Sequence, residues 1–188
     1  MATQQLKEWT YEDLFTLPDD GRRYEIIEGV LYEMPAPNTD HAQLIMNLIE
    51  LVFSPVVRAL AGCLFTAPVD VFLRGASPVQ PDLLVLLPGQ LRLISKRGIE
   101  GPPALIVEVL SPGNPEHDLV TKRLLYARAG VAEYWLVSPE VALIEILALD
   151  GDHYRTHARA AGDALLTSTM LPALSCPVSA VFTLAGGE

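Results

Sequence analysis

The sequence predicts a single α/β or α+β domain over residues 1–188, in which helices flank a mixed central β-sheet. Three observations favour this class. Short apolar runs rich in β-branched residues recur along the chain, a long stretch with helical spacing precedes most of them, and a second helical stretch separates two of them. The last arrangement is typical of a strand, helix and strand crossover. A chain of 188 residues can build one well-developed core, so we expect no second domain.

Three helices are predicted from apolar spacing and from capping residues. They cover Tyr11 to Leu17 after an N-cap at Thr10, about His41 to Ala61, and Glu116 to Ala129. Asp40 or Thr39 would cap the second helix, and Pro55 would end or kink it. Gly130 suits the position just after the third helix.

The strands are predicted from apolar runs bounded by glycine and proline. They cover Arg22 to Met34 with a bulge or hairpin turn at Gly29, Cys63 to Phe72, Val79 to Leu87, Ala104 to Leu110, Val131 to Val137, and a hairpin of Val141 to Leu149 with His153 to Ala158. A last strand and a short helix around Val178 to Leu184 are expected between Gly162 and Glu188.

Composition narrows the class of protein. Hydrophobic residues make up 50% of the chain and charged residues 19%, as in folded domains. The net charge of −10 argues against binding of nucleic acid by a broad basic surface, although a local cationic patch with bridging metal ions is compatible with it. Cys63 and Cys176 match no metal-ligand spacing and are expected to be reduced and buried.

The sequence contains no signal-peptide pattern, and we see no apolar run of the roughly 18 residues that a membrane span requires. We therefore expect a cytoplasmic protein without a membrane partner. No Gly-rich phosphate loop, nucleophile elbow or zinc-protease helix is present, so nucleotide kinases, serine hydrolases and zinc proteases have no support.

Two acidic residues stand in apolar strands. Glu108 lies inside the run Ala104 to Leu110, and Asp82 opens another apolar run directly after a proline. A buried carboxylate without a partner costs several kcal/mol or takes up a proton, so something must compensate Glu108. Two acids on two buried strands could share one Mg²⁺ or Mn²⁺ ion, whose bound water can act as a nucleophile. Lys122 would bring a cation near both acids.

Plainer interpretations of the same residues remain open at this point. Asp82 could cap a strand or turn, Glu108 could pair with an arginine, and Asp118 with Lys122 could be an ordinary helix pair four residues apart. An acid pair also occurs in glycosidases, where the separation of the carboxylates sets the stereochemistry. His153 and His157 are expected to be solvated, and Tyr134 and Trp135 to pack in the core.

An ordered set of motifs covers nearly the whole chain. It consists of YEIIEG at 24–29, His41 at the start of a helix, PDLLVL at 81–86, ALIVEVLSP at 104–112, Asp118 with Lys122, and YARAGVAEYWLVSP at 126–139. Together these motifs resemble the Uma-type restriction endonuclease family of the PD-(D/E)xK nuclease superfamily. The resemblance implies a restriction-endonuclease-like fold and magnesium-dependent hydrolysis of DNA phosphodiester bonds, with manganese as the alternative metal.

The resemblance also implies the site residues. Asp82 and Glu108 match the metal ligands, while Glu25 and His41 match positions that could complete the metal shell or orient water. The chain departs from the superfamily pattern at Leu110, where a lysine normally stands two positions after the glutamate. Lys122, on the following helix, is the matching basic residue and is expected to stabilise charge or orient water.

Substrate and partners follow as expectations. The most cationic loop of the chain contains Arg92, Lys96 and Arg97, which could contact the phosphate backbone of DNA. Because cutting both strands requires two sites, the resemblance implies a homodimer. The rival interpretation, favoured by the acidic charge, is a catalytically silent module with this fold that binds nucleic acid or protein.

Overall fold

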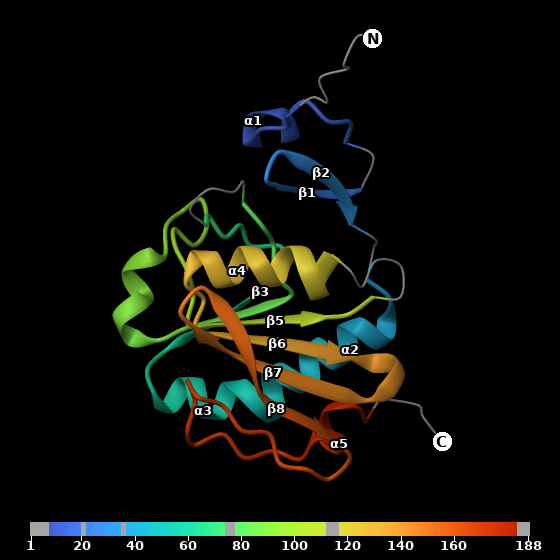
Figure 1. Cartoon of the computed structure of the whole chain (residues 1–188), viewed down its shortest axis with the longest axis vertical. Helices are drawn as coiled ribbons and strands as arrows, with labels where there is room; N and C mark the ends of the chain where they lie inside the picture. Colours follow the sequence, from blue (N-terminus) through green and yellow to red (C-terminus); the bar gives the residue numbers. More distant parts are fainter. Residues whose placement is uncertain (1–7, 20–21, 35–36, 74–77, 112–116, 184–188) are drawn as a thin grey trace.

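A computed structural model describes residues 8–19, 22–34, 37–73, 78–111 and 117–183 (Figure 1). Its main feature is a six-stranded sheet with the strand order β3-β4-β5-β6-β7-β8. The strands are β3 Cys63–Thr66, β4 Leu83–Leu86, β5 Leu105–Val109, β6 Glu133–Ser138, β7 Leu143–Asp150 and β8 His153–Ala161. Only β5 and β6 pair in parallel and all other neighbours are antiparallel, so the predicted mixed central sheet is confirmed.

A separate antiparallel hairpin lies beside the sheet. It joins β1 Arg23–Ile27 to β2 Val30–Met34 through a turn at Glu28 and Gly29, which both have positive φ angles of 50° and 77°. The predicted turn at Gly29 is thus a hairpin turn. With the short helix α1 Tyr11–Leu14, the hairpin forms one end of the molecule (Figure 1).

Two long helical segments connect the strands. The first is continuous through α2 Thr39–Asn47, the π-helical η1 Leu48–Phe53 and α3 Ser54–Ala59, and the second runs through the π-helical η3 His117–Lys122 and α4 Arg123–Ala129. The shorter helices are η2 Pro88–Leu93, η4 Pro139–Val141 and α5 Val178–Val181. Gly130 follows α4 with a φ of 87°, as predicted for a residue that ends a helix.

Helices cover both faces of the sheet. Neighbouring residues of a strand point to opposite faces, so each strand packs against helices on both sides. Residues such as Val107 and Trp135 pack with α2, η1, α3 and α5, whereas Ile106, Tyr134 and Leu136 pack with α4. Both faces of β4 and β5 are therefore buried, which explains their unbroken apolar sequences.

The long helix Thr39–Ala59 is apolar and long enough, by length and composition alone, to cross a membrane, with a mean hydropathy of 1.3. No such run was expected from the sequence. In the structure this helix lies on the sheet and buries Leu44, Leu48 and Phe53 in the core. A core helix passes the same test of length and composition.

Several element boundaries differ from prediction. Strand β3 stops at Thr66, well before Phe72, because Pro68 has no N–H to continue the ladder. Helix α1 stops at Leu14, not at Leu17. A last strand was predicted between Gly162 and Glu188. Within the described residues 162–183 the structure contains only an isolated bridge between Leu165 and Pro177, so this prediction is wrong there.

Candidate functional site

The five predicted site residues line one cavity of about 600 Å³. It opens where β4 begins and β5 ends, because these two strands are antiparallel neighbours. Helix α2, helix η3 and the β1–β2 hairpin close it. The residues that line it and were predicted as site residues are Glu25, His41, Asp82, Glu108 and Lys122.

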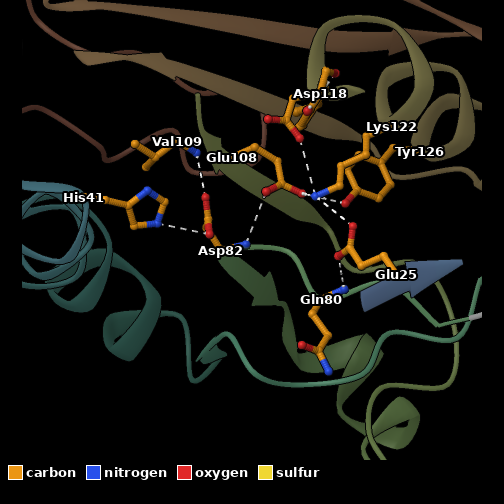
Figure 2. Close-up of polar contacts among 10 residues, drawn as sticks. Glu25, His41, Gln80, Asp82, Glu108, Val109, Asp118, Lys122 and Tyr126 are labelled. Atoms are coloured by element: carbon orange, nitrogen blue, oxygen red, sulfur yellow. Dashed lines mark hydrogen bonds and ion pairs between the residues drawn. The ribbon is translucent and has the colours of Figure 1, made fainter. Parts of the chain in front are cut away.

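Asp82 stands just before β4, after a proline that keeps the chain extended. One carboxylate oxygen accepts a hydrogen bond of 2.8 Å from the backbone N–H of Val109, and the other lies 3.2 Å from Nε2 of His41 (Figure 2). His41 is placed by Asn38, whose side chain accepts a 2.8 Å bond from its backbone N–H and thereby caps α2. The predicted caps Thr39 and Asp40 are helical residues, so the cap lies one or two positions earlier.

Glu108 lies on the α4 face of β5 and is compensated by Lys122, not by an arginine. Its Oε1 atom is 3.0 Å from the ammonium nitrogen of Lys122, which also lies 3.3 Å from Glu25 and 3.4 Å from Asp118 (Figure 2). The side chains of Glu108 and Lys122 are 4% and 1% exposed. The pair of Asp118 and Lys122 is real, yet it is one part of a larger buried network.

Tyr126, one helical turn after Lys122, completes this network. Its hydroxyl donates a hydrogen bond of 2.7 Å to the same Oε1 atom of Glu108. Burial, then the negative charges of Glu108 and Glu25, raise the pKa of Tyr126 well above its ordinary value, so the hydroxyl keeps its proton. Tyr126 therefore holds Glu108 in place as a donor.

The charges of this network do not balance. Burial is the main reason that the pKa of Glu108 lies well above its ordinary value, and Asp82, Asp118 and Glu25 raise it further while Lys122 lowers it. Burial alone would lower the pKa of Lys122, but attraction to Glu108, Glu25 and Asp118 raises it overall. The ammonium therefore stays charged, and the surplus of carboxylates favours uptake of a proton or of a cation.

The chemistry of this donor set fits a hard divalent ion. In the part of the chain that the structure describes, no three His, Cys, Asp or Glu side chains form a complete metal centre. Mg²⁺ does not need one, because it usually binds one or two carboxylates and takes its other ligands from water and substrate phosphates. Asp82 and Glu108 line the same cavity, and the backbone nitrogen of Asp82 lies 3.4 Å from Oε2 of Glu108.

The three predicted DNA-contacting residues do not line this cavity. Lys96 and Arg97 border a second cavity, and the guanidinium of Arg92 donates to the backbone oxygen of Gly89. Conversely, sequence reasoning gave no site role to Tyr126 or to Gln80, whose N–H donates a 2.8 Å bond to Glu25. The spacing of Asp118, Lys122 and Tyr126, each four positions apart, is the signal that could have placed all three on one helix face.

Another buried acid shows that burial alone does not make a site. Glu133 is fully buried at the start of β6, and neutral donors satisfy it: the indole of Trp135 at 2.7 Å, the Ser168 hydroxyl at 2.7 Å, and both the backbone N–H and the hydroxyl of Thr169. It does not line the large cavity. The cavity and the cation, not burial, distinguish Glu108 from Glu133.

Comparisons with known proteins identify the fold and the family. A solved structure described as "a putative nuclease belonging to DUF820 from Anabaena variabilis ATCC 29413" superposes with a TM-score of 0.74 and 20% sequence identity, covering 93% of this chain and 97% of that one. At this identity the likeness shows the fold. No curated protein matches the sequence. The profile of the Uma2 family, described as "Putative restriction endonuclease", matches residues 11–179, and the chain therefore belongs to that family.

Proposed function

We propose that this protein is a magnesium-dependent endonuclease that hydrolyses DNA phosphodiester bonds, with Mn²⁺ as an alternative metal. Membership of the restriction endonuclease family supports the reaction class. The observation that carries the proposal is the cavity in which Asp82 and Glu108 meet beside Lys122, with more carboxylates than cations. Such a site repels a phosphate unless a divalent ion neutralises it.

In this proposal Asp82 and Glu108 hold the metal. The ion would supply an activated water molecule and neutralise charge on the reacting phosphate. Val109 N–H and His41 orient the carboxylate of Asp82, while Tyr126 and Lys122 orient that of Glu108. These hydrogen bonds fix the two carboxylates before substrate binds.

Lys122 acts as a charge-stabilising group. Since its neighbouring carboxylates raise its pKa, it is a poor acceptor of protons and a good partner for developing negative charge. Glu25 holds the ammonium from the opposite side at 3.3 Å and itself accepts a bond from Gln80. We therefore assign Glu25 a positioning role, and His41 the orientation of Asp82 or of a water molecule.

Three further features of the proposal concern the DNA contacts, the assembly and the location of the protein. Lys96 and Arg97 bind the DNA backbone outside the acidic cavity, and Arg92 contributes positive charge on the same connection. The active form is a homodimer, as the resemblance to the nuclease superfamily implies. The protein acts in the cytoplasm.

The proposal is tested by cleavage of supercoiled plasmid DNA with Mg²⁺ or Mn²⁺. Asp82→Asn and Glu108→Gln should lower the cleavage rate by about 100-fold or more, because each removes one metal-binding charge. Asp152→Asn, which changes a side chain that is 95% exposed, is the matched control and should cleave like the wild type. Circular dichroism establishes that each variant is folded.

Two results would contradict the proposal. Equal cleavage by the wild type and by Asp82→Asn would remove the assigned site. DNA binding by the wild type, without cleavage at any concentration of either metal, would favour the catalytically silent module that the net charge of −10 suggests. Calorimetric titration with Mg²⁺ adds a readout that does not depend on activity, because the Asp82→Asn variant should lose metal binding.

A further inference from the structure

A second cavity, of about 340 Å³, lies next to the acidic one, and Gln80 lines both. The backbone N–H of Gln80 donates to Glu25 in the acidic site, and its side-chain amide donates a 2.9 Å bond to Asp70 on the side of the second cavity. Gln80 therefore forms part of the wall of both cavities. A chain molecule bound in one lies next to the other.

The rim of the second cavity is cationic. Lys96 and Arg97 line it, and the connection from Pro88 to Gly101 contains three basic residues against the single acid Glu100. The one carboxylate within the cavity, Asp70, accepts hydrogen bonds from Gln80 and from the hydroxyl of Tyr11. A negatively charged ligand would meet a local surplus of positive charge here, despite the acidic net charge.

An aromatic row continues from this rim across the surface. The guanidinium of Arg97 lies 3.8 Å from the centroid of the Phe72 ring, and that ring meets Tyr11 edge to face at 5.7 Å. Tyr11 in turn meets Phe15 at 5.1 Å, and Phe15 is 75% exposed. Arg97 is exposed and Tyr11 and Phe72 are half-buried, so Phe15 and Arg97 are the members of this row that solvent reaches most.

We propose that this stacking surface, made of Phe15, Tyr11, Phe72, Arg97 and Lys96, binds an unpaired segment of single-stranded DNA next to the acidic cavity. Exposed aromatic rings, a stacked arginine and nearby cations are the features that hold single strands, because unpaired bases offer their faces for stacking. A duplex covers those faces. The inference rests on the proposed function and names its substrate class.

The acidic cavity itself favours the same substrate. Glu108 and Lys122 are 4% and 1% exposed, and Asp82 is 17% exposed, so a reacting phosphate must enter the cavity to reach them. The phosphates of a duplex lie on a stiff rod, whereas a single strand can bend inward at one nucleotide. Tyr24, Met34 and Phe182 give the cavity an apolar wall against which a base can pack.

Binding in EDTA, where no metal-dependent hydrolysis occurs, tests the inference separately from the proposed function. The probes are a fluorescent single strand of about 15 nucleotides, the same sequence as a duplex, and an abasic strand of equal length and charge. Fluorescence anisotropy gives Kd for each. The variants are Phe15→Ala and Arg97→Lys, with Arg58→Ala as the control, because Arg58 is an exposed arginine on α3, at the other end of the molecule (Figure 1).

The single strand should bind at least tenfold more tightly than the duplex. Phe15→Ala and Arg97→Lys should each weaken binding of the single strand by about tenfold, since each removes one stacking partner. Both should leave the abasic strand unchanged, and Arg58→Ala should change none of the three values. Because Phe15 is 75% exposed and Arg97→Lys preserves the charge, neither change should unfold the protein.

Equal affinity for duplex and single strand would overturn the inference, as would equal losses with the abasic strand, which would indicate charge without stacking. The two proposals fail separately. The expected binding pattern together with a wild type that cleaves neither plasmid nor single-stranded DNA with Mg²⁺ or Mn²⁺ would support the stacking surface and contradict the nuclease. Cleavage that depends on Asp82, together with a Phe15→Ala variant that binds the single strand like the wild type, would support the nuclease and contradict the stacking surface.

Discussion

Replacing Lys122 by methionine should strongly destabilise the protein in a pH-dependent way. The substitution keeps the length of the side chain and removes an ammonium that lies within 3.0 to 3.4 Å of Glu108, Glu25 and Asp118. Removal of one partner from a buried ion pair typically costs about 3 to 5 kcal/mol, because the other charge stays buried without compensation. With three carboxylates involved, we expect the upper part of this range near pH 8.

The loss of stability caused by Lys122→Met should become smaller toward pH 5. Without the ammonium, the attraction that lowers the pKa of Glu108 is lost, while burial and the charges of Asp82, Asp118 and Glu25 still raise it, so this carboxyl group is best tolerated in the folded protein when it is protonated. A group whose pKa is raised on folding loses stability as the pH increases. The wild-type lysine, whose pKa is also raised, stays charged throughout this interval. The difference between the two proteins therefore widens from pH 5 to pH 8.

Urea unfolding followed by the fluorescence of the buried Trp135 measures this difference. Lys96→Met is the matched control, because it removes an exposed lysine and should change the free energy of unfolding by less than about 0.5 kcal/mol. A loss for Lys122→Met below about 1 kcal/mol at pH 8 would refute the reasoning. So would an equal loss at both pH values.

Three other predictions concern single groups. Tyr126→Phe removes the 2.7 Å bond to Glu108 and should cost about 1.5 to 3 kcal/mol in urea unfolding, and a cost near zero would mean that Lys122 alone positions the acid. Because the pKa of Glu108 is raised, protons compete with Mg²⁺ for its carboxylate, so calorimetry should show affinity rising between pH 5 and pH 8; a flat profile would contradict the assigned ligand. Asn38→Ala removes the cap of α2 and should cost about 1 kcal/mol in thermal unfolding, whereas Asn38→Asp should retain most of the stability.

The sequence predicted the positions of the two strand acids well, because proline and an interrupted apolar run are local signals. Glu108 was expected to need a partner, and it has Lys122 at 3.0 Å. The same argument applies to Glu133, yet the run that contains it, Val131 to Val137, was interpreted only as a strand. Which buried acid faces a cavity depends on segments far away in the chain, such as 168 and 169, and no local pattern contains that information.

Boundaries were predicted less well for physical reasons. Thr39 or Asp40 was predicted to cap α2, but Asn38 is an equally suitable residue type, and the structure has Asn38 as the cap because its side chain accepts a hydrogen bond from His41 N–H. The π-helical turns at Leu48–Phe53 and His117–Lys122 leave no sequence signal of their own. Leu119, three residues before the buried Lys122, is 37% exposed.

The contact between Glu25 and Lys122 has a consequence for how the protein forms during synthesis. Glu25 leaves the ribosome before the helix that contains Lys122 has been made. Until that helix has formed, no ammonium group neutralises Glu25 on the β1–β2 hairpin, so the carboxylate of Glu25 must stay hydrated. The hairpin can therefore dock stably only after residue 122 has been translated, so the cavity cannot be complete before that point.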